Sequence, residues 1–173
     1  VCTEEKKEKN NIIRFLNYPT RVTYIGRLDK DSEGLLLMTN NGDIINKMMR
    51  AGNQHEKEYK VTVNKPVTKE FIEKMAEGVP ILDTVTRKCK VEMIGKYKFR
   101  IILTQGLNRQ IRRMCEYLGY KVTRLERIRV MNITLGELKP GEYRKVTEAE
   151  IQKLYELIKD SSNETVIPKK QEQ

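Results

Sequence analysis

Histidine is nearly absent from this sequence, because His55 is the only one among 173 residues. A metal site rich in histidine, or a catalytic triad built on histidine, would have to rest on that one residue. The sequence also contains no glycine-rich loop of the kind that binds nucleotide phosphates. If the chain is an enzyme, its chemistry must therefore come from carboxylates, tyrosines, lysines and arginines.

Cysteine is scarce as well, with three widely spaced residues, Cys2, Cys89 and Cys115. They form no Cys-x-x-Cys pair, so we predict neither a disulfide framework nor a metal site, and a reducing, cytoplasmic location. No apolar run approaches the roughly 20 residues needed to span a bilayer, so we predict no membrane contact. The charged first residues contain no signal-peptide core, and the lack of an initiating Met indicates a fragment of a longer chain.

Positive charge is what the sequence has in excess. Lysine and arginine total 34 against 24 acidic residues, which gives a formal net charge of +10. Such an excess favours a polyanionic partner, either a nucleic acid or an acidic membrane surface. The length suits one domain, and we predict a domain over residues 1–160 followed by a disordered C-terminal tail over residues 161–173.

The hydrophobic pattern predicts both strands and helices. Strands are expected over residues 22–28, 33–39, 57–63, 90–94 and 98–104, with a strand-rich region over residues 121–134. Helices are expected over residues 42–50, 68–77, 109–118 and 148–159, with Thr68 as an N-cap and Gly119 as a C′ residue. Strands and helices do not alternate regularly, which favours an α+β fold with a largely antiparallel sheet.

The first motif that could carry chemistry is GRLDKDSEGLL, residues 26–36. It places Asp29 at the end of a predicted strand, between basic residues. A carboxylate beside arginine or lysine has a lowered pKa and stays ionised, as a nucleophile or a general base requires. The alternative is an exposed turn whose charges are simply solvated, and the residues alone leave both interpretations open.

The second motif is GLNRQIRRM, residues 106–114, which groups three arginines at the start of a predicted helix. A guanidinium fork matches two phosphate oxygens, so this cluster suits a nucleic-acid backbone, although a solvated basic face is equally consistent with it. The third motif is Lys57-Glu58-Tyr59 on a predicted strand. Tyr59 could be a core residue or a catalytic one, Lys57 could contact phosphate or solvate an edge, and nearby His55 is most simply a hydrogen-bonding loop residue.

Together the three motifs resemble those of the bacterial rRNA pseudouridine synthases of the RsuA type, most closely the RluF-like branch that acts on large-subunit rRNA. The Gly-Arg-Leu-Asp motif with its following Gly-Leu-Leu strand lies at residues 26–36, the Lys-x-Tyr motif at 57–59 and the Gln-Ile-Arg-Arg-Met motif at 110–114. The resemblance implies a pseudouridine-synthase fold, a curved, mixed and mostly antiparallel sheet with flanking helices and a central cleft. Residues 1–160 would then be the catalytic domain.

The resemblance also implies roles for individual residues. Asp29 is the essential carboxylate, Arg112 pairs with it and orients it, and Tyr59 stacks on the target base. The residues expected to contact RNA are Arg27, Lys57, Asn108, Arg109 and Arg113. The implied reaction converts a specific uridine of rRNA to pseudouridine after base flipping, with tRNA as a further substrate, no metal, no cofactor and a monomeric enzyme.

Two other functions fit parts of the sequence. A non-catalytic RNA-binding module would share the basic charge, but it would not require Asp29, Tyr59 and Arg112 together. A DNA-binding regulator could use residues 109–118 as a recognition helix, but no partner helix precedes them at helix-turn-helix spacing. Members of the resembled family usually carry a small basic RNA-binding domain ahead of the catalytic domain, and that domain is missing here.

Overall fold

The fold is built on one large sheet in a computed structural model that describes residue 2 and residues 11–50 and 55–159. The strands of this sheet are β2 (Glu33–Gly34), β4 (Lys57–Val63), β7 (Lys90–Gly95), β8 (Lys98–Leu103), β9 (Val122–Val130) and β10 (Ile133–Thr134). Five of them lie in the order β10-β9-β4-β8-β7 with antiparallel neighbours, and β2 adds to β9 in parallel. The predicted α+β class with a mixed, mostly antiparallel sheet is therefore confirmed.

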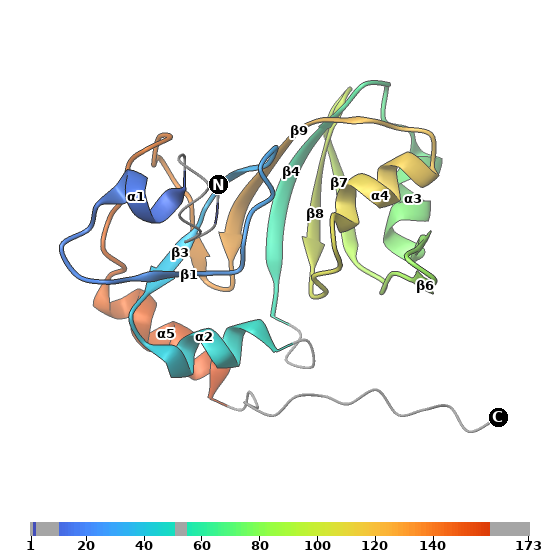
Figure 1. Ribbon diagram of the computed structural model, residues 1–173. Coiled ribbons are helices and arrows are strands. Elements are labelled where there is room, and N and C mark those ends of the chain that lie inside the picture. Colours follow the sequence, from blue (N-terminus) through green and yellow to red (C-terminus); the bar gives the residue numbers. More distant parts are fainter. Residues whose placement is uncertain (1, 3–10, 51–54, 160–173) are drawn as a thin grey trace.

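One group of helices covers the β4-β8-β7 side of this sheet (Figure 1). Helices α3 (Lys69–Glu77) and α4 (Gln110–Tyr117) bury their apolar sides against the sheet. Phe71 of α3 stacks edge-on against Phe99 of β8 with ring centroids 5.3 Å apart, and Met114 of α4 is fully buried. Edge-to-face aromatic pairs add to the stabilisation that comes from burial of apolar surface.

A second hydrophobic cluster lies on the other side of β4 and β9 (Figure 1). It is formed around a two-stranded ribbon of β1 (Thr23–Ile25) and β3 (Leu37–Thr39), together with helices α2 (Gly42–Met49) and α5 (Glu148–Ile158). Ile25, Met48 and Leu154 are buried there. The two clusters thus lie on either side of β4 and β9, and both draw residues from β9, Leu125 for the first and Val130 for the second.

Several predicted elements are confirmed. Strand β4 has the predicted bounds, and Thr68 caps α3 by accepting a hydrogen bond from the Phe71 amide at 3.1 Å. Helix α4 is followed by Gly119 with a φ of +81°, as expected of a C′ residue. Helix α5 begins with a capping box between Thr147 and Glu150. Local sequence signals were sufficient for these elements.

Three local predictions were wrong. The single strand predicted over residues 33–39 is two strands, because the chain leaves β9 after Gly34 and pairs instead with β1. The sequence patterns also did not predict the short helix α1 (Ile12–Leu16), which is capped by Asn11. A hairpin of β5 (Pro80–Ile81) and β6 (Thr84–Val85) was also missed, and its turn residues Leu82 and Asp83 both have positive φ, as in a type I′ turn.

The predicted tail over residues 161–173 lies outside the described residues. Across the described residues, no helix is both long and apolar enough to cross a membrane. The three cysteines, Cys2, Cys89 and Cys115, are free.

Gly34 lies directly against the backbone of Arg127, so a larger residue at this position should destabilise the protein. Its φ is +113°, and a Cβ at this position would lie 2.2 Å from the Arg127 carbonyl oxygen. Because backbone must move to relieve that contact, we expect Gly34→Ala to lower the free energy of unfolding by about 1–3 kcal/mol. Gly42→Ala is the matched control, since a Cβ there meets no atom within 4 Å. Equal urea midpoints for the two variants would contradict this explanation.

Candidate active site

The loop between β1 and β2 carries Asp29 on the surface, next to the boundary between the two clusters. Its side chain is 42% exposed, and its carboxylate lies 3.8 Å from a terminal nitrogen of Arg109. The loop turns at Asp29, whose carbonyl accepts a hydrogen bond from the Ser32 amide at 2.9 Å. Arg27, two residues earlier, is exposed to solvent. The carboxylate is thus accessible to a large substrate and lies beside positive charge.

Arg127 of β9 holds both ends of this loop. It is 2% exposed, and its guanidinium donates one hydrogen bond to the Gly26 carbonyl at 2.9 Å and another to the Leu35 carbonyl at 2.8 Å. The Leu35 amide in turn donates to the Arg127 carbonyl at 2.7 Å. Because both ends of the segment that contains Asp29 are fixed to one rigid strand, the position of the carboxylate is set by the sheet.

Lys57 lies beside Arg127 beneath the same loop. A Cβ built on Gly26 would lie 3.6 Å from the Lys57 Nζ and 3.7 Å from a terminal nitrogen of Arg127. Burial lowers the pKa of Lys57, and the nearby Arg127 charge lowers it further. Neither cation forms an ion pair with any other described residue. A buried and a half-buried positive charge side by side favour an anionic group bound close to the loop.

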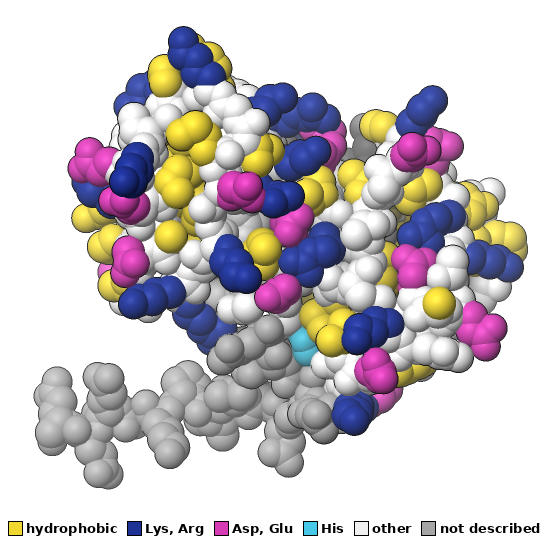
Figure 2. Space-filling view, turned by 180° about the vertical axis from the view of Figure 1, so that it is seen from behind, with side chains coloured by type: hydrophobic (Ala, Val, Ile, Leu, Met, Phe, Trp, Pro, Cys, Tyr) yellow, Lys and Arg dark blue, Asp and Glu magenta, His cyan; other side chains and the backbone are white. Residues whose placement is uncertain are grey.

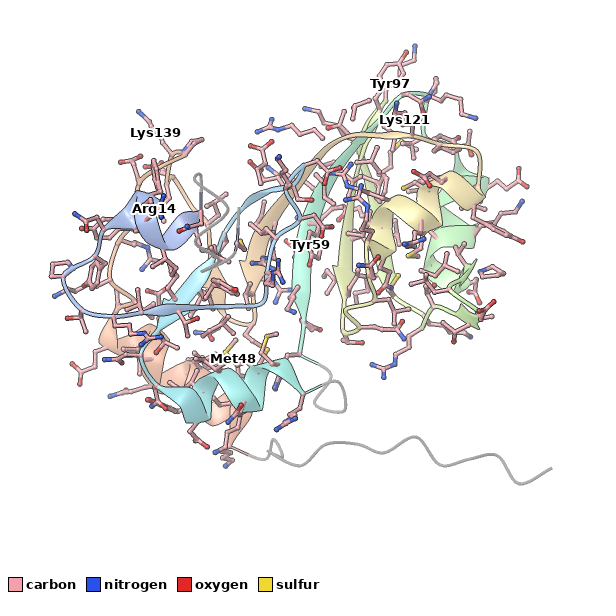
Figure 3. The ribbon with its side chains drawn as sticks, in the orientation of Figure 1. Arg14, Met48, Tyr59, Tyr97, Lys121 and Lys139 are labelled. Carbon is pink, nitrogen blue, oxygen red and sulfur yellow. The ribbon has the colours of Figure 1, made fainter. Side chains whose placement is uncertain are left out.

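Tyr59 lies on β4 between these cations and the core under α3 and α4. It is opposite Arg127 on β9 and Ile101 on β8 in the sheet register, and it is half-buried against the first cluster. Figure 3 shows Tyr59 in the central part of the sheet, between the two groups of helices. A half-buried aromatic ring at this place offers a flat apolar surface on which a nucleobase can stack.

The start of α4 approaches the Asp29 loop from the other side. Arg109 immediately precedes the helix in a left-handed conformation, with a φ of +48°. Its guanidinium binds the Asp31 carboxylate with two hydrogen bonds, at 3.0 and 2.9 Å. Arg112, one turn further on, has a side chain that is only 11% exposed, and it donates to the Asp31 carbonyl at 2.7 Å and to the Ser32 hydroxyl at 3.4 Å. These contacts join the two sides of the site.

The predicted pairing of Arg112 with Asp29 differs from the arrangement seen here. Arg109 is the arginine that lies within ion-pair distance of the Asp29 carboxylate, whereas Arg112 contacts Asp31 through its carboxylate at 3.5 Å and its carbonyl. The turn at residues 29–32 is the physical reason, since it directs the main chain of Asp31 toward α4. Arg112 therefore holds the loop two residues beyond the predicted carboxylate.

The contacts of Arg109 and Arg112 with Asp31 should be detectable in the titration of the Asp31 carboxyl group. Hydrogen bonding from Arg109 is the main cause that lowers the pKa of Asp31 from its ordinary value of 3.8 to about 2. Ionised Asp31 thus stabilises the folded protein above pH 3.8, and this contribution is lost as the pH falls through about 2. We expect Arg109→Ala to return the pKa of Asp31 toward its ordinary value in a carboxyl NMR titration.

Arg113→Ala is the matched control for that titration. The Arg113 guanidinium donates to the carbonyl and to the side-chain oxygen of Asn108, each at 3.0 Å, and not to Asp31. It should therefore leave the Asp31 titration unchanged. If Asp31 of the wild-type protein has a pKa near its ordinary value, the proposed effect of Arg109 is contradicted.

The remaining predicted site residues lie around this centre but not all within it. Asn108 and Arg113 bind each other at the approach to α4. His55 is bonded through its Nε2 to the Lys47 carbonyl at 3.0 Å, in agreement with its interpretation as a hydrogen-bonding loop residue. Within the described ranges, no three histidine, cysteine or acidic side chains come together as a metal-binding group.

Known proteins resemble this chain in both sequence and structure. The profile of the RNA pseudouridylate synthase family matches residues 2–117. The dual-specificity RNA pseudouridine synthase RluF of Salmonella typhi is 58% identical over 164 residues, which cover 95% of this chain. The ribosomal large subunit pseudouridine synthase B of Bacillus subtilis is 33% identical over 155 residues, or 86% of this chain and 64% of that protein.

A solved pseudouridylate synthase structure shares the fold, with a TM-score of 0.79 and 34% identity over 83% of this chain and 65% of that one. The match to RluF of Salmonella typhi covers 57% of that protein, so the chain spans little more than half the length of this curated relative. The matched region contains the Asp29 loop, β4 with Tyr59 and the arginines of α4.

Proposed function

The chain belongs to the RNA pseudouridylate synthase family, and from that premise we propose that it converts a specific uridine of ribosomal RNA to pseudouridine. The observation that carries the proposal is the accessible Asp29 carboxylate on a loop fixed by Arg127, which is itself the partner of Tyr59 in the register of β4 and β9. This arrangement suits a flipped nucleotide, with the base on the tyrosine and the ribose at the carboxylate.

The proposed reaction exchanges one bond for another within the same nucleotide. Asp29 promotes cleavage of the bond between uracil N1 and ribose C1′, either by attack on C1′ or by removal of a ribose proton. The detached uracil turns within the site, C5 bonds to C1′, and the proton on C5 leaves. Tyr59 is proposed to hold the uracil while it is detached, and its hydroxyl to take part in that proton transfer. This reaction needs no cofactor, because the bonds that break and form lie within the same nucleotide.

The basic residues are proposed to bind the RNA or to hold the Asp29 loop in position. Lys57 and Arg127 provide positive charge beneath the loop, next to the developing negative charge of the uracil. Arg109, Asn108 and Arg113 are proposed to meet phosphates at the start of α4, and Arg27 to replace the flipped base in the stack. Arg112 acts through Asp31, so we regard it as a positioning residue.

The substrate is proposed to be large-subunit rRNA, with a tRNA as a further substrate, because the chain is 58% identical to the dual-specificity RNA pseudouridine synthase RluF of Salmonella typhi. The protein is proposed to act as a monomer in the cytoplasm. The test is site-by-site mapping of pseudouridine in the rRNA and tRNA of cells that lack this gene, with and without the restored gene. One site lost and then regained supports the proposal and names the substrate. If no site is lost, a non-catalytic RNA-binding role replaces it.

A further inference from the structure

Three segments meet at one end of the large sheet. They are residues 62–68 at the end of β4 and after it, residues 94–98 around the turn of the β7–β8 hairpin, and residues 118–124 after α4 and at the start of β9. The Asn64 amide donates to the Lys121 carbonyl at 3.0 Å, the Val63 amide to the Tyr97 carbonyl at 2.9 Å, and the Val67 amide to the Lys96 carbonyl at 2.8 Å. These bonds make the three segments one rigid surface.

Four lysines of this surface are exposed, and none forms an ion pair within the described structure. We call the surface the lysine end and define it by Lys65, Lys96, Lys98 and Lys121. The three segments contain no aspartate or glutamate at all. The nearest acidic residues along the chain are Glu70 of α3, Glu116 of α4, Glu92 of β7 and Glu126 of β9. The last two form ion pairs with Arg100 and Arg124, not with these lysines. The positive charge of the lysine end is therefore not neutralised locally.

The outward face of the same sheet shows a different arrangement. There the charges are matched, as in the ion pairs of Arg100 with Glu92, of Arg124 with Glu33 and of Arg129 with Glu56. Figure 2 shows basic and acidic side chains interleaved on the face seen from behind. Since neighbouring parts of one sheet differ so clearly, the lysine end is a distinct feature and not a consequence of the overall excess of lysine.

Two tyrosines are interleaved with the lysines. The Lys65 Nζ lies 4.4 Å from the centre of the Tyr120 ring, and the Lys96 Nζ lies 5.6 Å from the centre of the Tyr97 ring. Cation–π contacts of this kind hold lysine side chains in place at a surface. Tyr97 is also 41% exposed. Tyr120 is half-buried against Phe71. An exposed aromatic ring such as Tyr97 among unpaired cations is typical of surfaces that bind nucleic acids.

The lysine end lies along the strands that lead away from Tyr59. Figure 3 shows Tyr97 and Lys121 together at one end of the sheet, with Tyr59 in its central part. Six residues separate Tyr59 from Lys65, which corresponds to at most roughly 20 Å along an extended chain. That distance is about the rise of six base pairs of a nucleic-acid duplex. A stem that flanks a uridine bound at Tyr59 could therefore reach the lysine end.

We propose that the lysine end is a second RNA-contact surface, which binds the phosphate backbone of the stem that flanks the target uridine. The inference rests on the proposed function for the identity of the RNA, but the surface itself is defined by charge and contacts alone. Phosphate contacts of this kind carry no sequence information and fix the orientation of the RNA on the enzyme. The lysine end would thus select RNAs with a stem of sufficient length.

The test compares two variants of the whole chain that lose the same charge. In the first, Lys65, Lys96, Lys98 and Lys121 are changed to Gln. In the control, four other exposed lysines, Lys60, Lys90, Lys153 and Lys159, are changed to Gln. The probes are an RNA hairpin with about twelve base pairs beside its target uridine and the same hairpin cut to about four, spanning the roughly six base pairs inferred above.

We expect the first variant to raise KM for the long hairpin roughly tenfold or more and to leave kcat at saturating RNA nearly unchanged. The slope of log affinity against log salt concentration should become shallower by about 3, since each lost phosphate contact removes somewhat less than one. The short hairpin should not distinguish the first variant from wild type. The control variant should behave as wild type with both hairpins.

The following outcomes would overturn this proposal or the proposed function on which it rests. Equal increases in KM for both variants would assign the effect to net charge, and no increase for either would leave the lysine end without contact to RNA. If wild type binds vesicles of anionic phospholipid through these lysines and the long hairpin does not compete, the surface serves a membrane. If wild type forms no pseudouridine in any RNA, the proposed function fails, while direct binding of the hairpins still tests the surface.

Discussion

Asp29→Asn should reduce pseudouridine formation by about 10³-fold or more and leave the protein folded. The amide keeps the size of the carboxylate, but it can neither attack C1′ nor accept a ribose proton. The side chain is largely solvent-accessible, and its one ion pair, with Arg109, is long at 3.8 Å. Its replacement should thus change the free energy of unfolding by no more than about 0.5 kcal/mol. Release of tritium from RNA labelled at uracil C5 measures turnover, because that hydrogen leaves in the proposed reaction.

Two matched variants separate catalysis from support of the loop. Asp83→Asn changes an exposed carboxylate in the β5–β6 turn, where a positive φ of +60° suits asparagine, and should keep full activity. Asp31→Asn removes the carboxylate that Arg109 and Arg112 bind, and should cause a partial loss. If Asp29→Asn keeps activity within about tenfold of wild type, the carboxylate is not essential and the proposed reaction must be abandoned.

The parts of the fold that the sequence predicted well are those set by local signals. The second half of β4 alternates between buried and more exposed residues, and Gly119 follows the C-cap of α4, so both elements carry a local signal. The strand predicted over residues 33–39 failed because its pairing is decided by β9, which lies about ninety residues away along the chain. The switch of partners after Gly34 is a tertiary property and leaves no periodicity to detect.

The site, too, was predictable from the sequence only in part. The motif likeness identified Asp29, Tyr59 and the arginines of α4, but it could not decide which carboxylate each arginine binds. Asp29 and Asp31 are two residues apart, and only the turn closed by the Ser32 amide directs Asp31 toward Arg109 and Arg112. Sequence spacing alone therefore assigned Arg112 to the neighbouring carboxylate.

Arg127 is the residue of the site that sequence reasoning missed. Its hydrogen bonds go to backbone carbonyls, which give no sequence signal. A usable clue was present, because Leu125 and Arg127 occupy alternate positions of a strand and both are buried. A charged residue at an inward strand position indicates a buried hydrogen-bond network, and here that network holds the Asp29 loop.

The largest effect on stability is therefore expected at Arg127. Arg127→Met fills much of the same space, but it leaves the carbonyls of Gly26 and Leu35 without their buried donor. Hydrogen bonds from a charged group are worth about 1.5–3 kcal/mol each, so we expect the free energy of unfolding to fall by about 3–5 kcal/mol. Arg127→Lys keeps the charge but cannot reach both carbonyls with one planar fork, and it should lie between Met and wild type.

Arg124→Met provides the matched control on the same strand. The Arg124 side chain is 57% exposed, and it forms ion pairs with Glu33 and Glu126. Exposed ion pairs contribute about 0–1 kcal/mol, so this variant should unfold at nearly the wild-type urea concentration. Equal midpoints for Arg124→Met and Arg127→Met would mean that the buried arginine does not hold the loop. A large difference, with Arg127→Lys intermediate, would show that one planar guanidinium joins the sheet to both ends of the segment that carries Asp29.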